Sequence, residues 1–415
     1  MKILSQDDYL SVNEDVILHL TPSGARVTIH YPDEISLDRG MRKIPVANIN
    51  LTARDILLSC VGEQTARSVI NELISKSSQN NMEDDQVIRE VMDFFQQLIN
   101  YNVLKPHSLP HRLSPHVTGS IDFFMPQHMS IELTANCNLR CIYCYRDAGP
   151  SHKEYLPGDL LIRILGDLEK YGLQSVELTG GEPLLHPEFK QIFNYCVDHF
   201  LRVVLLSNGC LINQNITDLL GSHKEKVIVQ VDIDGNSPDT HDRIRGVPGS
   251  FIKTTNAVRL LAKAGVKTRV AMNVTKTNLD EIENTLLLSK QIGAHWFAFT
   301  PVLDLGRGKA LDPSYSLEQV KYITNLSKRL HEEYEGFIGY LDHDTFVEMF
   351  KNEGNCGAGH KVAVLGPTGK VRPCPLLPED VLAFGDLTKD SVETVFSNPI
   401  IPMMNQLKSP NIDTS

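Results

Sequence analysis

The chain has 415 residues, of which 41% are hydrophobic and 22% charged. A domain usually takes ~100–200 residues, so we expect two or three domains with real cores and exclude disordered and collagen-like classes. The net charge of −11 has the wrong sign for general binding to nucleic-acid phosphates. No apolar run approaches the ~18 residues of a membrane span, and the start lacks the apolar segment of a secretory signal. A cytoplasmic protein without nucleic-acid or membrane partners is therefore predicted.

Residues 1–105 predict a small α+β unit. Segments rich in β-branched residues at 16–20, 25–31 and 44–51 are separated by turn signals, which indicates strands. Two apolar stripes at helical spacing follow, within 69–74 and 87–98. We therefore expect the strands first and the helices after them. Residues 106–126 contain four prolines and three histidines without periodicity, which predicts a linker.

Residues 127–310 alternate short apolar segments with helical ones, the pattern of βα units on a parallel sheet. The six strands are expected at 129–133, 175–178, 203–206, 227–233, 267–273 and 296–300. The helices are expected at 159–170, 188–200, 213–220, 251–264 and 279–292. The predicted fold class is α/β, a partial (β/α)6 TIM barrel whose site lies at the carboxyl ends of its strands. Residues 311–415 are expected to add a helix and a third, small domain.

Three cysteines, Cys137, Cys141 and Cys144, follow the first barrel strand directly in a CxxxCxxC pattern. In a cytosolic chain, clustered thiols indicate metal ligands before disulfides. Iron–sulfur cubanes normally take four thiolates, so three close ligands imply one iron open to an exogenous ligand. An open coordination position is typical of a catalytic site. A zinc knuckle is the alternative, but it needs a fourth local ligand, and no His or Cys follows within the next few residues.

This spacing and its place after strand one resemble the radical S-adenosylmethionine (SAM) superfamily. The second strand runs into Gly180-Gly181-Glu182-Pro183, which is similar to the family's GGEP element that holds the SAM amino group. Glycines let a backbone approach a ligand, and a carboxylate accepts hydrogen bonds from an ammonium. Taken alone, GGEP would more often be an ordinary turn.

Further segments at the strand ends resemble family elements that contact the SAM ribose and carboxylate. They contain Asn208 after the third strand, Asp232 at the end of the fourth, and Arg245, which would suit a carboxylate. Relatives often place Ser where Asp232 stands. Tyr143, just before the third cysteine, matches the family's aromatic position beside the adenine; a core aromatic is the alternative. The resemblance covers about residues 129–307.

The resemblance implies a [4Fe–4S] cluster and SAM as cofactors. One-electron reduction of the cluster would cleave SAM to methionine and a 5′-deoxyadenosyl radical, which abstracts hydrogen from the substrate. A flavodoxin- or ferredoxin-type reductase would supply the electron. The protein would provide orientation, electrostatics and exclusion of water and oxygen.

The N-terminal unit resembles the winged-helix recognition elements of ribosomal-peptide (RiPP) modification systems, through the stretch at 49–57, Gly62 and two amphipathic helices. Such elements bind a leader peptide as an added strand. A DNA-binding winged helix is the alternative, and the scarcity of basic residues in the helices counts against it. The resemblance therefore implies a precursor peptide as partner.

The C-terminal segment holds Cys356 and Cys374, with Gly369 before the second one. This arrangement resembles the opening of the auxiliary-cluster domains called SPASM or twitch, but no cysteine follows Cys374. Three hypotheses compete: Cys356 and Cys374 ligate an auxiliary cluster together with other groups, both are structural, or one is a catalytic hydrogen-atom donor.

The full layout resembles ribosomal-peptide maturases. We therefore expect an enzyme that abstracts hydrogen at a peptide Cα and yields either a thioether cross-link or a D-residue. Two rival hypotheses are a radical SAM enzyme of small-molecule cofactor biosynthesis and a non-enzymatic leader-peptide binding partner.

Overall fold

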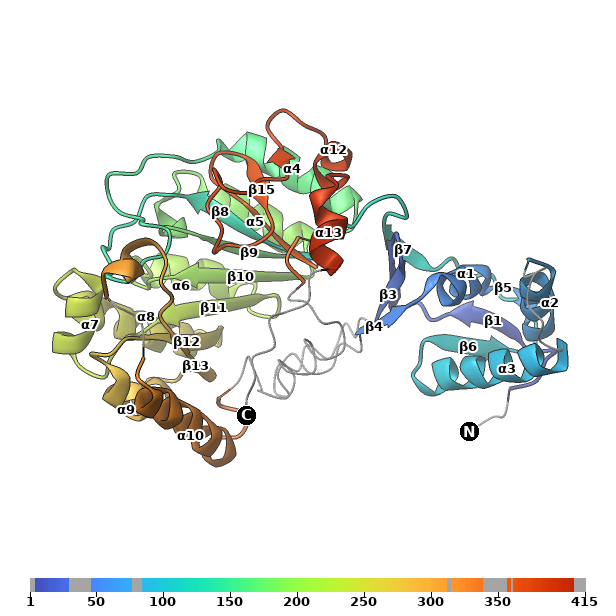
Figure 1. Ribbon diagram of the computed structural model, residues 1–415, viewed down its shortest axis with the longest axis horizontal. Helices are drawn as coiled ribbons and strands as arrows, with labels where there is room; N and C mark the ends of the chain where they lie inside the picture. Colours follow the sequence, from blue (N-terminus) through green and yellow to red (C-terminus); the bar gives the residue numbers. More distant parts are fainter. Residues whose placement is uncertain are drawn as a thin grey trace. The chain divides into compact units, whose positions relative to one another are not determined.

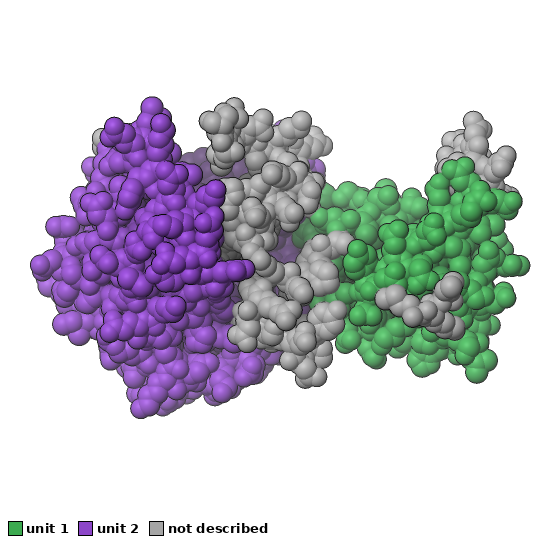
Figure 2. Space-filling view, turned by 90° about the horizontal axis from the view of Figure 1, so that it is seen from below, with its two compact units in different colours: residues 1–37, 41–124 green, residues 38–40, 125–415 purple. Residues whose placement is uncertain are grey.

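The computed structural model describes residues 4–29, 46–76, 84–311, 315–338, 357–359 and 361–406. The chain divides into two compact units, one formed by residues 1–37 and 41–124 and the other by residues 38–40 and 125–415 (Figure 2). Among the described residues, no helix combines the length and the apolar character that crossing a membrane requires.

The first unit contains two small sheets and three helices in its described part (Figure 1). Its elements are β1 (Tyr9–Val12), β2 (Val16–Thr21), β3 (Gly24–Ile29), β4 (Val46–Ile49), α1 (Leu51–Ser59), β5 (Val61–Thr65), α2 (Ala66–Lys76), α3 (Asp84–Asn100), β6 (Leu104–His107) and β7 (His116–Gly119). The strand orders are β5-β1-β6 and β4-β3-β2-β7. One apolar core joins these sheets to the helices, with Leu10, Leu18, Leu57 and Phe95 among its buried members.

Two expectations for this region are wrong. The strands do not all precede the helices, because β5 lies between α1 and α2, and β6 and β7 follow α3. Nor is 106–126 a plain linker: β6 pairs with β1 and β7 pairs with β2. Both are edge strands, where Pro106 removes no hydrogen bond from a sheet interior. Segments this short show no periodicity that would distinguish them from a linker.

The second unit is built on six parallel strands, all of which the sequence predicts. They are β8 (His128–Thr134), β9 (Ser175–Gly180), β10 (Arg202–Ser207), β11 (Val227–Asp232), β12 (Lys267–Val274) and β13 (Trp296–Pro301). Each pairs with the next in chain order, from Ser130↔Glu177 at one end to Val270↔Phe297 at the other. This arrangement confirms the α/β class and the partial barrel.

Helices follow the strands as expected. They are α4 (Gly158–Lys170), α5 (Phe189–His199), α6 (Gln214–Gly221), α8 (Ser250–Lys263), α9 (Ile282–Gln291) and α10 (Leu317–Glu333), with short 3-10 helices η2 (Pro183–Leu185), η3 (Leu279–Glu281) and η4 (Gly306–Leu311). An unpredicted helix, α7 (Pro238–Arg245), follows β11. Ser237 caps its start through the Thr240 N–H, and Gly246 ends it at a φ of 71°.

The C-terminal segment continues the barrel sheet. Strand β14 (Val362–Leu365) pairs in parallel with β8, and β15 (Lys370–Arg372) and β16 (Gly385–Asp386) extend the sheet beyond it. Helices α12 (Val392–Phe396) and α13 (Ile400–Gln406) follow. The C-terminal segment is therefore not the separate domain that we expected, because the apolar strand β14 pairs along the edge of β8.

Candidate active site

One cavity of about 510 Å³ lies where the carboxyl ends of the barrel strands meet the cysteine loop, residues 137–148. Its strand-end walls include Gly180, Gly181, Ser207, Asn208, Asp232, Asn273 and Thr300. Phe297, Phe299 and Met272 are apolar lining residues from β12 and β13, and Leu376 contributes from the C-terminal segment. This is the edge where a parallel barrel places its chemistry.

Cys137, Cys141 and Cys144 all line this cavity. Burial raises the pKa of the Cys137 thiol to about 12 and that of the Cys141 thiol to about 11. Both thiols are therefore protonated unless a bound metal centre stabilises the thiolate. The structure thus brings together the three residues on which the predicted cluster depends.

Nitrogen donors surround the two buried sulfurs. The Leu139 N–H lies 3.4 Å from Cys137 Sγ, Asn208 Nδ2 lies 3.8 Å from the same sulfur, and Arg245 Nη1 lies 3.6 Å from Cys141 Sγ. Hydrogen bonds to sulfur help to set the potential of iron–sulfur clusters, so this donor set fits such a cluster. Within the described ranges, no three His, Cys, Asp or Glu side chains are arranged to ligate a single metal ion.

Arg307 clamps the cysteine loop. Its Nε donates to the Cys141 carbonyl (2.8 Å), its Nη2 donates to the Ala148 carbonyl (2.9 Å), and its Nη1 pairs with Asp147 (2.5 Å). At Gly306, a Cβ would lie 2.5 Å from the Cys144 carbonyl oxygen, so only glycine allows this approach. From the sequence, we assigned no such role to Arg307; the triplet Gly306-Arg307-Gly308, which begins five residues after the end of β13, is the signal that could have revealed it.

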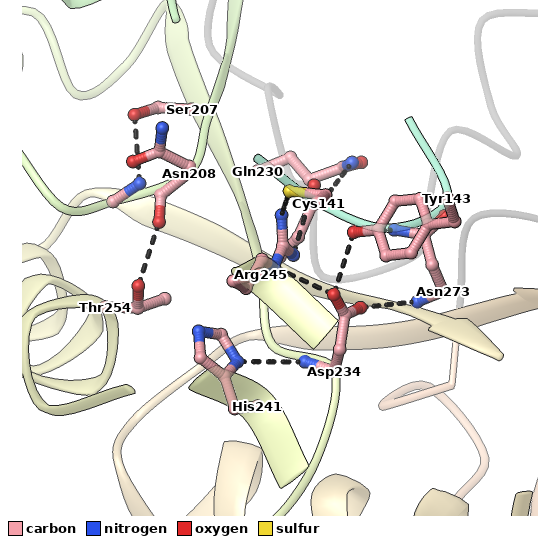
Figure 3. Close-up of polar contacts among 12 residues, drawn as sticks. Cys141, Tyr143, Ser207, Asn208, Gln230, Asp234, His241, Arg245, Thr254 and Asn273 are labelled. Atoms are coloured by element: carbon pink, nitrogen blue, oxygen red, sulfur yellow. Dashed lines mark hydrogen bonds and ion pairs between the residues drawn. The ribbon is translucent and has the colours of Figure 1, made fainter. Parts of the chain in front are cut away.

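Arg245 lies in a buried polar cluster beside Cys141 (Figure 3). Its Nε lies 2.8 Å from Asp234 Oδ2, and its Nη2 lies 3.5 Å from Asp232. Asp234, which we did not predict as a site residue, also accepts hydrogen bonds from the Tyr143 hydroxyl (2.8 Å) and the Asn273 N–H (2.9 Å). Burial raises the pKa of Asp234, and the Arg245 guanidinium opposes that rise. The guanidinium is thus held by protein carboxylates, while Tyr143, Asp232 and Arg245 all line the cavity.

Glu182 is wholly buried and does not line the cavity. Its carboxylate accepts from the Leu184 N–H (3.1 Å), the Ser207 hydroxyl (2.9 Å) and the Asn208 N–H (2.8 Å). Burial raises the pKa of Glu182 to about 7, although the three hydrogen bonds act to lower it. The carboxylate thus ties the end of β9 to the end of β10, and Pro183, also buried, begins the 3-10 helix η2.

The two glycines before Glu182 line the cavity, and they also allow two backbone segments to approach closely. A Cβ at Gly180 would lie 2.4 Å from the Thr134 carbonyl oxygen, and one at Gly181 would lie 2.2 Å from that of Asn136. Gly180 has a φ of +135°, which disfavours any L side chain. These glycines therefore let the end of β9 approach the backbone that leads into the cysteine loop, a reason that we did not anticipate.

Of the other predicted site residues, Asn208 lines the cavity and Cys374 does not. Asn208 lines the cavity, and its Nδ2 donates to Asn138 Oδ1 (2.8 Å). Cys374 is half-buried and does not line the cavity, although Leu376, two residues later, does. Cys356 lies outside the described residues, so its predicted role remains a prediction.

Comparison with known proteins agrees with this geometry. The model of the Radical SAM superfamily matches residues 131–288. The sporulation killing factor maturation protein SkfB of Bacillus subtilis is 31% identical over 286 residues, which cover 68% of this chain and 67% of that protein. The chain belongs to the radical SAM superfamily. Enzymes of this superfamily use a [4Fe–4S] cluster and SAM, so these two expected cofactors are confirmed.

Two further proteins are similar over nearly the whole chain. The antilisterial bacteriocin subtilosin biosynthesis protein AlbA of Bacillus subtilis is 29% identical over 401 residues, 96% of this chain and 87% of that protein. The crystal structure of Streptococcus suis SuiB bound to the precursor peptide SuiA has a TM-score of 0.65 at 13% identity, covering 97% of this chain and 92% of that one. At that identity, the likeness to SuiB shows the fold alone.

Proposed function

We propose that this radical SAM enzyme modifies a ribosomally made precursor peptide by abstracting hydrogen from one of its residues, at Cα. Full-length similarity to the subtilosin biosynthesis protein AlbA supports the proposal, since it includes the N-terminal unit as well as the barrel. Similarity to the maturation protein SkfB supports it as well. The observation that carries the proposal is the cavity that Cys137, Cys141 and Cys144 line together with the ends of the barrel strands.

The residues of the site have separable roles in this reaction. When bound, the reduced cluster and SAM supply a 5′-deoxyadenosyl radical that takes hydrogen from the substrate. Cys137, Cys141 and Cys144 would ligate three irons, and the N–H groups of Arg245 and Asn208 would donate to the sulfurs. Phe297 and Phe299 line the same cavity and would give part of it an apolar surface.

The N-terminal unit would recognise the leader of the precursor. An extended peptide can add to a sheet edge, where backbone hydrogen bonds give affinity and side-chain pockets give specificity. In the described part of the unit, β4 and β7 are the outer strands of the four-stranded sheet. In this proposal, the chain consists of a recognition element, followed by the barrel and its C-terminal extension.

Mass spectrometry tests the reaction. The full chain is coexpressed in heavy water with the short peptides encoded beside its gene, and the products are fragmented. A gain of one mass unit at a residue identifies epimerisation, with a cysteine such as Cys374 as a candidate hydrogen donor. A loss of two mass units identifies a thioether. A peptide that keeps its mass in every coexpression would contradict the proposal.

Deletion of residues 1–119 separates the peptide hypothesis from the small-molecule one. The peptide hypothesis predicts a large loss of peptide modification, with substrate-free SAM cleavage retained as evidence that the barrel is folded. If the small-molecule hypothesis is correct, turnover is unchanged. SAM cleavage by the reduced full chain also eliminates the hypothesis of a non-enzymatic binding partner.

A further inference from the structure

Four charged side chains join the cysteine loop to the C-terminal segment; we call them the Glu132 network. Glu132, near the end of β8, accepts from Arg146 Nη2 at 2.7 Å and from Arg372 Nη2 at its other oxygen. Arg372 Nη1 lies 3.3 Å from Glu379 Oε1, and Arg146 lies 3.9 Å from the same oxygen. Two arginines and two glutamates leave the network without net charge.

The network is buried at its centre. The Arg372 side chain is 0% exposed and the Glu132 side chain is 1% exposed, whereas Glu379 and Arg146 are 15% and 19% exposed. Burial raises the pKa of Glu132, and the two guanidiniums oppose that rise. A buried ion pair is often no better for stability than apolar residues of the same volume, so stability alone does not account for this one. A buried network of this kind can instead fix one arrangement of the segments that it joins.

Those segments flank the cavity. Arg146 lies two residues after Cys144, and Arg372 lies two residues before Cys374. The Leu377 N–H donates to the Cys374 carbonyl at 3.2 Å, which closes a turn, and Leu376 of this turn lines the cavity. The network therefore stands between the loop that carries the cluster ligands and a turn that forms part of the cavity wall.

The local sequence accommodates the network. A Cβ at Gly366 would lie 1.7 Å from Glu379 Oε1 and 3.0 Å from Arg372 Nη1, so a larger residue there would displace the Glu379 carboxylate. Thr368 Oγ1 donates to the other Glu379 oxygen at 2.6 Å. The hairpin of β14 and β15 thus leaves room for the carboxylate and also fixes it.

We propose that the Glu132 network is a positioning device that holds the turn of residues 373–377 against the cysteine loop as one wall of the substrate cavity. Glu132, Arg372 and Glu379 would act through this turn on the placement of the substrate, and not on SAM. The part of the proposal that concerns a peptide substrate rests on the proposed function; the placement of the turn does not.

Hydrogen exchange measured by mass spectrometry tests the placement. The double variant Glu132→Gln/Arg372→Met removes both charges at once, so neither is left buried without its partner. Pro373 and Pro375 have no amide hydrogen, so exchange within 373–377 is measured at Cys374, Leu376 and Leu377. We expect exchange at the Leu377 N–H, which donates within the turn, to become about tenfold faster or more, with β10, β11 and β12 unchanged. The matched control is Glu283→Gln/Arg329→Met, which removes an ion pair that is 37% and 49% exposed in the same unit and should leave the turn as it is. Unchanged exchange at 373–377 in the double variant would overturn the proposal.

Gly366→Ala keeps every charge and displaces the Glu379 carboxylate, with Arg372 Nη1 also in tight contact with the new methyl group. This variant therefore tests the placement of the turn if the double variant loosens the whole unit. Faster exchange confined to 373–377 in this variant supports the proposal, and exchange like that of the wild type overturns it. With a peptide substrate, we expect both variants to give less modified peptide for each 5′-deoxyadenosine formed, while substrate-free SAM cleavage stays at the wild-type rate. If the wild type itself modifies no peptide, the proposed function fails, and the exchange result still decides the placement.

Discussion

At the scale of single residues, burial determines what each polar group of the site can do. Glu182 and Asp234 are fully enclosed, and each carboxylate has several protein partners. Such groups hold loops in place, because an enclosed carboxylate that loses a partner is costly. The residues that line the cavity, among them Asn208 and Arg245, are the ones placed to contact bound molecules.

Glu182→Gln should destabilise the SAM-free protein by about 1–3 kcal/mol, because the new amide would face N–H donors where a carboxylate oxygen now accepts. Urea unfolding of the apoprotein measures this effect, and Glu283→Gln at an exposed pair is the control. Unchanged stability together with weakened SAM binding would instead favour the direct contact with SAM that the motif predicts.

His241 should make stability depend on pH. Burial, followed by the charge of Arg245, lowers its pKa from 6.5 to about 3, and its Nδ1 accepts from the Asp234 N–H at 3.2 Å. Below pH 6.5, the unfolded chain binds a proton at His241 that the folded chain does not bind. The stability that His241 contributes is therefore fully present above pH 6.5 and is lost as the pH falls toward 3. From this residue, we expect a loss of about 2 kcal/mol between pH 7 and pH 5.

The variant His241→Asn isolates this contribution, because its amide oxygen can accept from the same N–H without titrating. Chemical unfolding between pH 5 and pH 7 should give a flatter stability profile for the variant than for the wild type. Parallel profiles would contradict the assignment to His241.

At the scale of elements, the sequence predicts the repeated strands and helices of the barrel. It does not predict strands that pair with partners far away in the sequence. The six barrel strands carry apolar residues at alternate or consecutive positions, as in Val176 and Leu178 of β9 and Val203 to Leu206 of β10, so each is recognisable alone. Strand β14 is just as apolar, but its partner β8 lies far away in the sequence, so no local pattern indicates that they pair. Helix α7 is only eight residues long and has a polar sequence, so its apolar periodicity is weak.

Arg307→Met should loosen the cysteine loop, because the loop loses three contacts at the Cys141 carbonyl, the Ala148 carbonyl and Asp147. We expect less iron per chain after anaerobic reconstitution, with the melting temperature lowered far less than the iron content. Arg329→Met on α10 is the matched control, since it removes an arginine whose ion pairs are exposed. Full iron content in Arg307→Met would contradict the clamp.

At the scale of the whole molecule, the sequence predicts the barrel, the cysteine motif and a minority of the residues that line the cavity. It does not reveal how the site is supported, because Asp234, Arg307 and the Glu132 network act through contacts between distant segments. Short motifs identify residues that meet a cofactor. The supporting contacts depend on the folded arrangement of loops, which a single sequence does not encode in any local pattern.

The proposed activity depends most directly on Cys137, Cys141 and Cys144 holding a cluster that cleaves SAM. The decisive measurement is electron paramagnetic resonance of the anaerobically reconstituted, dithionite-reduced full chain, combined with chromatography for 5′-deoxyadenosine after SAM is added. We predict a reduced [4Fe–4S] signal that changes with SAM, formation of 5′-deoxyadenosine, and loss of both in Cys137→Ala/Cys141→Ala/Cys144→Ala. A wild-type protein that binds zinc in place of iron at these cysteines, or forms no 5′-deoxyadenosine, would contradict the account.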